Sequence, residues 1–460
     1  ARNQGPSPHF YSSAMAALAE EPPVDTMELE NSSDDEAQPE EGTRLKKGKA
    51  KAVVEVAQGI PNEPDFNEQL LRQYYDRLFP YDPMFRWLSY GNDPHSKTDN
   101  PAVDRDFFMK REWSFTLADD IYIRYLTFRD AAEMKAGMLK KMPHKIDIGA
   151  VYTCPAKDHK TVNASQFRTV ERELVFDIDL TDYDEVRTCC TGAKICRKCW
   201  SYMTMAIDVL DSSLKEDFGF ENILYIYSGR RGVHCWVSDP QARALSDPAR
   251  SAVVDYLSVT TTGVSQDASD KMAMKKPDFS WPPHPSLARS YGILEPYFAQ
   301  HIVPEEGQGI FADPEQWRPI LATLPVQSIA NKLETKWDRA SDRTTASDKW
   351  AELCEEISSR RGQSGGGGLV KKQRLGESKE LELWKLNLVF HHCYPKLDEN
   401  VSKMQNHLLK SPFAVHPKTG RVCIPIDPAS MDTFDPFEVP TICRLCEEIN
   451  AYDSAAKQAG

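Results

Sequence analysis

The sequence predicts an α+β fold, in which helices flank a central mixed β-sheet and a mainly helical subdomain is inserted into the chain. Short apolar runs that are typical of strands alternate with helical stretches up to Asp239, which gives this region an α/β texture. After Val259 the strand signals fade and amphipathic helical segments dominate. The mixed texture returns after Leu383, so the helical segment interrupts the mixed core.

Individual elements follow from local patterns. A helix is predicted to begin after Asn67, whose side chain can cap it, and to end before Pro80. The apolar face of this helix would consist of Leu70, Leu71, Tyr74 and Leu78. Further helices are predicted at 201–220, 315–324 and 348–360. The predicted strands are 121–125, 147–152, 173–180, 222–228 and 233–237, with a strand–turn–strand unit at 407–427.

Changes in texture and composition divide the chain into five predicted regions. The sequence QSGGGG at 363–368 is typical of a flexible linker or loop. The regions are a disordered acidic tail (1–62) that carries a basic run (44–51), the first part of the mixed core (63–258), a helical insertion with the Gly-rich loop (259–383), the second part of the core (384–450) and a frayed C-terminus (451–460).

The net charge of -13 does not exclude nucleic acid as a partner, because the acidic residues are unevenly placed. Ten acids and no base lie between Glu20 and Glu41. The basic run RLKKGKAK (44–51) has two interpretations. It is a solvated run of charge without a function, or it is functional, as a nuclear import signal or a loose contact with nucleic acid. The eleven cysteines are too sparse for a disulfide scaffold, and no apolar run is long enough to cross a bilayer. We therefore expect a reducing compartment and no membrane.

Two aspartates stand one residue apart in the apolar run ELVFDIDL (173–180). Because side chains alternate along a strand, the even-numbered apolar residues would share one face and Asp177 and Asp179 the other. A divalent cation would offset the repulsion between the two carboxylates, and hard oxygen ligands favour Mg²⁺ or Mn²⁺. Such pairs serve nucleotidyl or phosphoryl transfer, but the pattern also occurs in nucleotide-sugar glycosyltransferases and on edge strands with solvated acids.

Four cysteines follow this strand closely, Cys189, Cys190, Cys196 and Cys199. Four thiolates at this density suit a tetrahedral structural Zn²⁺ site with no open position. Two unrelated pairs of reduced thiols are the alternative, and the Cys-x2-Cys spacing favours zinc over it. The predicted zinc motif (189–199) would hold the loop that leaves the carboxylate strand.

A Ser-Gly-Arg-Arg-Gly turn between two predicted strands offers groups that bind anions. Gly229 and Gly232 permit a tight turn with exposed backbone donors, and Arg230 and Arg231 can bind phosphate oxygens in a bidentate manner. Together with His234 on the following strand, we interpret the turn as a triphosphate clamp. A basic hairpin on the surface is the alternative.

A later segment repeats this pattern more weakly. Asp398 offers a third carboxylate, and Lys410 and His416 follow as a pair that can bind anions. Their spacing alone is compatible with a shared site but does not require one.

Several blocks of the sequence resemble one family, the small catalytic subunit of eukaryotic DNA primase in the archaeo-eukaryotic primase superfamily. The blocks are REWSFTLADDIYIRY, KIDIGAVY, ELVFDIDLTDYD, the cysteine cluster, YSGRRGVHCWV, and PKLDENVSK with NHLLKSPFAVHPKTGR, in the family order. The resemblance runs from Asn67 to Ile449 and is looser between residues 260 and 385. One departure lies beside Asp398, where Glu399 occupies a position that is usually apolar.

The resemblance implies a primase-type catalytic core and assigns roles to single residues. Asp177, Asp179 and Asp398 would bind the catalytic Mg²⁺ or Mn²⁺ ions, and Asp147 would contact the ribose. The four cysteines of the cluster would bind the structural Zn²⁺. Other catalytic-site residues would be Glu112, Tyr122, Arg124 and Lys145. The nucleotide would further contact Ser228, Arg230, Arg231, His234, Leu408, Leu409, Lys410 and His416.

The implied activity is that of a DNA-directed RNA polymerase that makes short RNA primers from NTPs on single-stranded DNA for replication, by two-metal nucleotidyl transfer. The implied partners are an iron–sulfur large subunit, the DNA polymerase alpha complex and the template, and the implied location is the nucleus. The residues alone leave two other functions open. These are a Mn²⁺-dependent nucleotide-sugar glycosyltransferase and a non-catalytic zinc-bearing nucleic-acid adaptor.

Overall fold

The computed structural model describes residues 66–92, 103–259, 279–339, 344–362 and 368–459. The predicted acidic tail with its basic run, and residues 363–367 of the predicted Gly-rich loop, lie outside this range. Helices and antiparallel sheets combine in the described residues, which confirms the predicted α+β class. Within the same residues, no helix is both long and apolar enough to span a membrane.

The first sheet, called here the β1 sheet, has the strand order β2-β1-β3-β4, and β8 also pairs with β3. All of its pairings are antiparallel. Strand β1 was not among the predicted strands, because its charged Arg111 and Glu112 interrupt the apolar pattern although both side chains are buried. The strands are β1 (Arg111–Thr116), β2 (Tyr122–Leu126), β3 (Lys145–Tyr152), β4 (Thr169–Glu171) and β8 (Leu409–Lys410).

The second sheet, called here the β5 sheet, has the order β5-β7-β6-β9 and is also antiparallel throughout. The prediction of one mixed sheet was therefore wrong. The β6–β7 hairpin places β7 between β5 and β6. Strands β5 and β6, which the helix at Arg197–Glu216 connects, therefore run in the same direction but are not neighbours in the sheet. The strands are β5 (Leu174–Asp179), β6 (Ile223–Tyr227), β7 (Gly232–Val237) and β9 (Pro425–Ile426).

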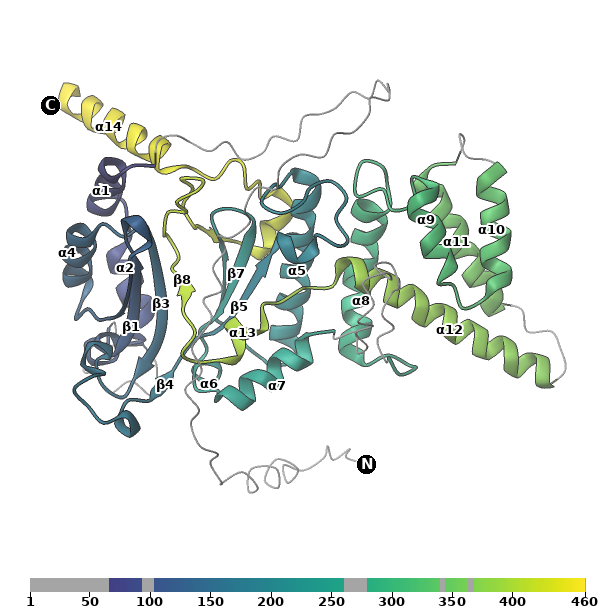
Figure 1. The fold of residues 1–460 in the computed structure, drawn as a ribbon, viewed down its shortest axis with the longest axis horizontal. Helices are drawn as coiled ribbons and strands as arrows, with labels where there is room; N and C mark the ends of the chain where they lie inside the picture. Colours follow the sequence, from purple (N-terminus) through teal and green to yellow (C-terminus); the bar gives the residue numbers. More distant parts are fainter. Residues whose placement is uncertain (1–65, 93–102, 260–278, 340–343, 363–367, 460) are drawn as a thin grey trace, which may run out of the picture. The chain divides into compact units, whose positions relative to one another are not determined.

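Helices α1 (Glu68–Arg77), α2 (Tyr81–Ser89) and α4 (Ala131–Lys141) lie along the β1 sheet (Figure 1). As predicted, Asn67 caps α1, and its side chain accepts a hydrogen bond of 2.9 Å from the backbone of Leu70. The apolar side chains of these helices share one core with β1 and β3. Its fully buried members include Leu71, Met84, Trp113, Met138 and Ile148. A short helix α3 (Arg105–Met109) leads into β1.

Helix α5 (Arg197–Glu216) lies beside the β5 sheet (Figure 1). Leu174, Phe176 and Ile178 pack into one core with the buried face of α5, whereas Val175 belongs to the core shared with the β1 sheet. The predicted alternation of β5 is therefore confirmed, and Asp177 and Asp179 lie on the face turned away from α5.

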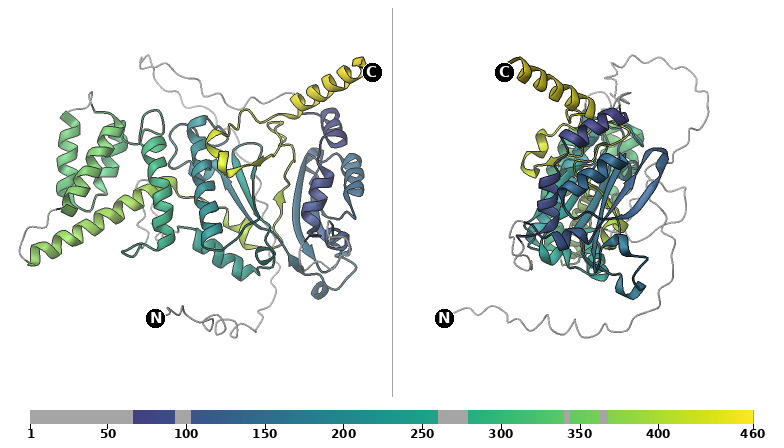
Figure 2. Two further views of the ribbon diagram at one scale, coloured as in Figure 1. Left: turned by 180° about the vertical axis from the view of Figure 1, so that it is seen from behind. Right: turned by 90° about the vertical axis from the view of Figure 1, so that its left-hand side faces the viewer.

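The middle of the chain is helical, and α12 continues past the boundary that we predicted at 383/384 (Figure 2). No glycine or proline interrupts the sequence between Glu377 and Tyr394, so the helix has no reason to end earlier. The helices are α6 (Pro240–Arg243), α7 (Asp247–Leu257), α8 (Pro285–Tyr297), α9 (Pro314–Ala322), α10 (Gln327–Arg339), α11 (Ala346–Gly362) and α12 (Gly368–Cys393).

The C-terminal segment contains α13 (Glu399–Lys403) and α14 (Ile442–Ala459). Residues 451–459, which we expected to be frayed, form the last turns of α14. Good helix formers favour this continuation, and Asp453 pairs with Arg77 of α1 at 2.9 Å. The strand–turn–strand unit predicted at 407–427 is present only in part, as the short strands β8 and β9 and an isolated bridge between Val415 and Val422.

A buried ionic cluster joins the two sheets next to β5. Glu173, which precedes β5, accepts hydrogen bonds of 2.8 and 2.9 Å from Arg111 of β1, one of 3.0 Å from Arg172, and one of 2.6 Å from the Tyr90 hydroxyl. Arg111 also donates to the carbonyl of Gly149 on β3 at 3.0 Å. Glu173, Arg111 and Arg172 are at most 1% exposed. Burial alone would raise the pKa of Glu173, but the charges of Arg111 and Arg172 outweigh it and lower the pKa.

Replacing Glu173 with Gln is expected to lower the free energy of unfolding by about 3–5 kcal/mol, because two buried guanidinium groups lose their counter-charge. Since the pKa of the carboxyl is lowered in the folded protein, this stabilisation is present above its ordinary pKa of 4.5 and is lost as the pH falls towards the lowered value. Urea denaturation at pH 7 measures the effect. Glu68→Gln, which removes an exposed pair with Arg72, is the control and should change the stability little. Similar small effects in both variants would contradict the role of the cluster.

Candidate active site

Asp177 and Asp179 form one side of a charged site at the end of β5. Both side chains are partly exposed, at 30% and 24%. Asp177 is paired in register with His234 of β7, and its Oδ1 lies 3.6 Å from Nε2 of that ring. Burial and then the charge of Lys410 lower the pKa of His234 to about 3, so the imidazole is neutral at physiological pH.

The third predicted carboxylate reaches this site from far along the chain. The backbone N–H of Asp398 donates a 3.0 Å hydrogen bond to the carbonyl of Asp177. Asp398 is the N-cap of α13, and its side chain accepts a 3.1 Å hydrogen bond from the backbone of Asn400. The structure therefore places the backbone of Asp398 against β5 at Asp177, although the two residues are 221 positions apart in the sequence.

A fourth carboxylate, Asp182, lies beside them and was missed in the sequence. Asp182 is exposed, but partial loss of hydration and then the charges of Asp179 and Asp398 raise its pKa to about 6. Four acids within the eight residues from Asp177 to Asp184 were the signal that could have indicated it. Asp179 and Asp398 are therefore close enough to Asp182 for their charges to act on it, although loss of hydration contributes more to the raised pKa.

The arginine turn lies against the carboxylates. Nε of Arg231 donates to both carboxylate oxygens of Asp179, at 2.8 and 2.7 Å. Gly232 closes the turn, where its N–H donates to the hydroxyl of Ser228 at 3.0 Å. The backbone of Gly229 has φ +89°, and a Cβ there would lie 2.6 Å from Cβ of His416. Only glycine fits this position without strain, which fixes the path of the turn.

The second basic segment packs onto the same turn. The ammonium group of Lys410 donates to the carbonyl of Ser228 at 3.4 Å, and the hydroxyl of Thr419 donates to the carbonyl of Gly229 at 2.7 Å. Burial and then the charges of Lys410 and Arg230 hold the pKa of His416 well below its usual value. Lys410, Thr419 and neutral His416 therefore surround the arginine turn, whereas His234 and Arg231 contact the carboxylates.

The β1 sheet forms a further wall of the site, beside the carboxylates of β5 and the arginine turn. Lys410 of β8 pairs in register with Asp147 of β3, whose carboxylate accepts a 2.9 Å hydrogen bond from Ser114. Loss of hydration raises the pKa of Asp147, while Ser114, Lys410 and Lys145 act in the opposite direction. Loss of hydration also raises the pKa of Tyr122, which lies near Ser114 and Asp147. Ser114 was not among the predicted site residues.

Glu112, which is buried, pairs with the partly exposed Arg124 at the edge of this wall. Nε of Arg124 donates to Glu112 at 2.9 Å, and the hydroxyl of Tyr152 donates to the same carboxylate at 3.0 Å. Nearby, Leu408 lies over Gly149, where a Cβ would be 2.8 Å from Cδ2 of the leucine. The side chain of Leu409 is not at this surface, because it packs with Ile148 in the apolar core.

The four cysteines gather into one cluster after β5. Among the described residues, their sulfur atoms form the one set of three or more Cys, His, Asp or Glu ligand atoms that all lie within 4.8 Å of one another. Sγ of Cys196 and Sγ of Cys199 are 3.9 Å apart, close to the roughly 3.8 Å that a tetrahedral zinc with Zn–S bonds of about 2.3 Å requires. The donor set therefore fits a tetrathiolate metal site.

Two side chains missed in the sequence support this cluster. Arg187 donates to Sγ of Cys199 at 3.9 Å and to the carbonyl of Gly192 at 2.7 Å, which places a buried positive charge beside the thiols. Gln308, from the helical region, donates to Sγ of Cys189 at 3.5 Å and accepts from the backbone of Thr188 at 2.7 Å. No local pattern marks Gln308, because 119 residues separate it from Cys189.

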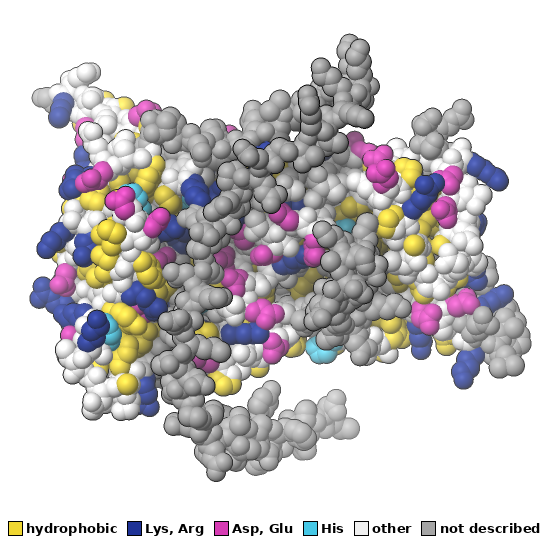
Figure 3. All heavy atoms as spheres, viewed as in Figure 1, with side chains coloured by type: hydrophobic (Ala, Val, Ile, Leu, Met, Phe, Trp, Pro, Cys, Tyr) yellow, Lys and Arg dark blue, Asp and Glu magenta, His cyan; other side chains and the backbone are white. Residues whose placement is uncertain are grey.

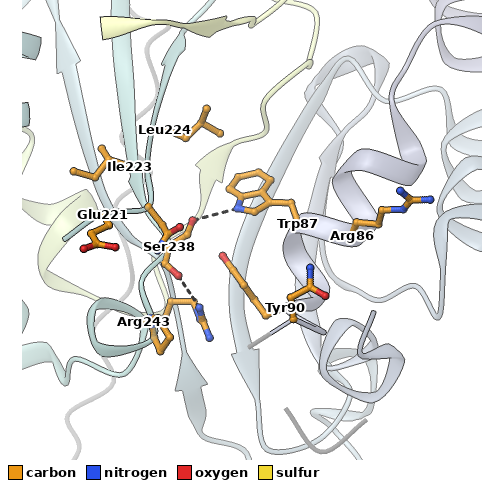
Figure 4. Close-up of a pocket in the computed structure, with 11 residues that line it drawn as sticks. Arg86, Trp87, Tyr90, Glu221, Ile223, Leu224, Ser238 and Arg243 are labelled. Carbon is orange, nitrogen blue, oxygen red and sulfur yellow. Dashed lines mark hydrogen bonds between the residues drawn. The ribbon is translucent and has the colours of Figure 1, made fainter. Parts of the chain in front are cut away.

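A separate cavity of about 640 Å³ lies between α2 and the opposite end of β7 (Figure 4). Trp87 donates to the hydroxyl of Ser238 at 3.1 Å, and Arg243 donates to the carbonyl of Ser238 at 2.6 Å. None of the predicted site residues lines this cavity. The charged site therefore lies elsewhere, on the face of β5 that carries Asp177 and Asp179.

Comparisons with known proteins agree on one family. A family model described as DNA primase small subunit matches residues 176–428. The DNA primase small subunit of Drosophila melanogaster is 40% identical over 396 residues, which cover 86% of this chain and 84% of that protein. The proteins of the same name from Schizosaccharomyces pombe and Saccharomyces cerevisiae are 38% and 35% identical and cover 84% and 82% of this chain. The aligned regions span 78% and 85% of those two proteins.

The Gly229→Ala variant is expected to be less stable than the wild type by about 1–3 kcal/mol, because alanine is strained at this φ and its Cβ would collide with His416. Gly219→Ala is a matched control, since Gly219 has φ +70° but no atom within 4 Å of the added Cβ. Urea denaturation of both variants measures the difference. Equal losses of stability would show that contact with His416 does not constrain the turn.

Proposed function

Because the chain belongs to the DNA primase small subunit family, we propose that it synthesises short RNA primers from NTPs on a single-stranded DNA template by nucleotidyl transfer. The observation that carries this proposal is the convergence of Asp398 on Asp177, next to a turn that presents Arg231 to Asp179. Primer synthesis needs such a combination of carboxylates and cations, because positioning and charge neutralisation supply most of the catalysis of phosphoryl transfer. The comparisons favour this function over the glycosyltransferase and the zinc-bearing adaptor.

Asp177, Asp179 and Asp398 would hold the divalent cations, and their oxygen-only donor set suits Mg²⁺ or Mn²⁺. Asp182 lies close enough to Asp179 and Asp398 for their charges to raise its pKa, after loss of hydration, and neighbouring carboxylates of this kind attract a cation. Bound ions would lower the pKa of the attacking hydroxyl and neutralise charge on the phosphates. Arg231 offsets part of the charge of Asp179 in the chain itself.

The cations of the site would bind the triphosphate of the incoming nucleotide. Arg230 and Arg231 project from the turn, and Lys410 reaches the same turn from β8. Arg231 can form bidentate hydrogen bonds to phosphate oxygens, so a triphosphate would compete with Asp179 for this guanidinium. Neutral His234 and His416 could each donate one N–H to a phosphate oxygen without adding charge.

The wall on the β1 sheet would bind the sugar. Asp147 is fixed by Ser114 and lies beside Lys410, so its carboxylate could accept a hydrogen bond from a ribose hydroxyl. Leu408 lies next to it over Gly149 and would contact the sugar or base. Leu409 would contribute only through its backbone, because its side chain is part of the core.

The cysteine cluster would bind a structural Zn²⁺. The cluster follows β5, and its four thiolates would fix the loop that leaves this strand. Arg187 would be a neighbouring positive charge. Gln308 would connect this metal site to the helical region. The zinc would do no chemistry, since four protein ligands leave no open position.

We also propose the assembly and location that the family resemblance implies. As a small subunit, the chain would act with a large subunit that carries an iron–sulfur cluster, within the DNA polymerase alpha complex. Its activity in DNA replication would place it in the nucleus. The acidic balance of the chain is consistent with help from a partner in holding the template.

The Asp177→Asn variant is expected to reduce primer synthesis at least about a hundredfold while the fold is retained, because it removes a charged ligand without changing the side-chain volume. Synthesis of labelled RNA on a polypyrimidine template with Mg²⁺ or Mn²⁺, with and without a large subunit, measures the activity. Asp119→Asn is the control, since asparagine tolerates the positive φ of this residue. Near-normal activity of Asp177→Asn would refute the assignment.

Zinc content provides an independent check on the cysteine cluster. Mass spectrometry of the purified chain should find about one Zn²⁺ per wild-type molecule and almost none in Cys196→Ala, whose melting temperature should also fall. Cys354→Ala, which removes a half-buried cysteine outside the cluster, should keep the metal. A metal-free wild type, or a Cys196→Ala variant that retains zinc, would contradict the site.

A further inference from the structure

Strand β2 contains a tyrosine in a strained backbone conformation. Tyr125 has φ +62°, a left-handed value that is rare for a bulky residue. In a regular strand, Arg124 and Tyr125 would point to opposite faces. Here the guanidinium of Arg124 lies 5.2 Å from the centre of the Tyr125 ring, so both side chains reach the same side. Glu112 holds this arrangement, because it accepts hydrogen bonds from Nε of Arg124 and from the backbone of Tyr125.

The strained tyrosine presents its ring to an aromatic group that other segments supply. The rings of Tyr125 and His159 are stacked with centres 3.9 Å apart, and those of Tyr152 and Phe167 are stacked at 4.2 Å. Tyr125, His159 and Phe167 are each partly exposed to solvent. Strained backbone persists where the surroundings hold it in place, and here it brings Tyr125 into a stack with His159 at a partly exposed position.

Basic side chains border these rings. The segment from Thr153 to Arg168, which follows β3, contains three exposed bases and one acid, Asp158. Lys and Arg side chains also gather over α4 and the β1 sheet on the face shown in Figure 3. The exposed bases of the segment are Lys157, Lys160 and Arg168.

The aromatic group adjoins the sugar end of the candidate site. Nη2 of Arg124, which lies over the Tyr125 ring, donates to the carbonyl of Asn406 at 3.5 Å. Asn406 is two residues before Leu408, which lies over Gly149. The rings are therefore next to the side chains proposed to contact sugar and base, and not next to the phosphate clamp.

We infer that this surface binds the single-stranded nucleic-acid template as it approaches the site, an inference that rests on the proposed function. Stacking on aromatic rings tolerates any nucleobase, as template binding by a polymerase requires. The Lys and Arg side chains next to the rings would contact the phosphates of the template. We call this surface the aromatic platform. It consists of Tyr125, His159 and Phe167, bordered by Lys157, Lys160 and Arg168.

The first test measures stacking. The full chain is titrated with a fluorescent oligothymidylate, and His159→Ala is expected to weaken binding about five- to tenfold, whereas His159→Phe, which keeps a ring, should stay within about twofold of the wild type. NTP affinity should not change in either variant. His301→Ala is the matched control, because His301 also stacks on a tyrosine, Tyr297, but lies in the helical region. Unchanged oligothymidylate binding by His159→Ala, or an equal loss in His301→Ala, would overturn the proposal.

The second test measures charge. Replacing Lys157, Lys160 and Arg168 with alanine should reduce the slope of log affinity against log salt by about 2, since each single-strand phosphate contact contributes about 0.7. The control replaces three exposed basic residues of the helical region with alanine and should leave the slope unchanged. These residues are Lys372, Lys379 and Arg339. Equal slopes in the wild type and in both triple variants would overturn the proposal.

Primer synthesis by the wild type in the same preparations separates this inference from the proposed function. If the wild type makes no RNA, the proposed function fails. If the wild type makes RNA and the platform variants do so equally well at a limiting template concentration, only the platform fails. The platform is supported if the variants lose synthesis at limiting template and regain it when the template is in excess.

Discussion

The buried carboxylate of Glu173 is the constraint on which the site depends. It lies between two sheets, immediately before the strand that carries Asp177 and Asp179, and it is bound by Arg111 of the β1 sheet and by Arg172. These charges are almost completely removed from water, so each is stable only while its partner stays in place. The cluster thereby fixes the position of β5 relative to the β1 sheet. A slip of one residue in β5 would turn both aspartates towards the core beside α5.

The rest of the site is assembled through backbone contacts, which tolerate little movement. Asp398 is bound to the carbonyl of Asp177, Lys410 pairs in register with Asp147, and the turn at Gly229 lies against His416. Four segments that are far apart in the sequence thus bring three carboxylates and several cations together. Such rigid placement is what phosphoryl transfer requires, since little covalent chemistry is left for the protein to perform.

Part of the negative charge of this site is offset by groups of the site itself. Arg231 pairs with Asp179, while burial keeps His234 and His416 neutral, so the carboxylates are offset without an excess of positive charge. After loss of hydration, the charges of Asp179 and Asp398 also raise the pKa of Asp182, so the carboxylates are not fully neutralised. In the proposed function, divalent cations would bind to the carboxylates and a polyphosphate to the cations, and each would supply the charge that the other needs.

The sequence by itself determined the local chemistry of the site. The alternation of β5, the glycine-permitted arginine turn and the close spacing of the cysteines depend on neighbouring residues, and the family resemblance rests on those same blocks. Only the tertiary structure decided that the strands form two antiparallel sheets, that Leu409 faces the core, and that Glu112 and Arg111 are buried in a strand. It also decided that Ser114 bonds to Asp147 and that Arg187 and Gln308 contact the cysteine cluster. The physical reason is that these outcomes depend on strand register and on contacts between residues that can be more than a hundred positions apart. No local pattern of polarity encodes such contacts, because a charged residue in a strand reads as exposed until its buried partner is known.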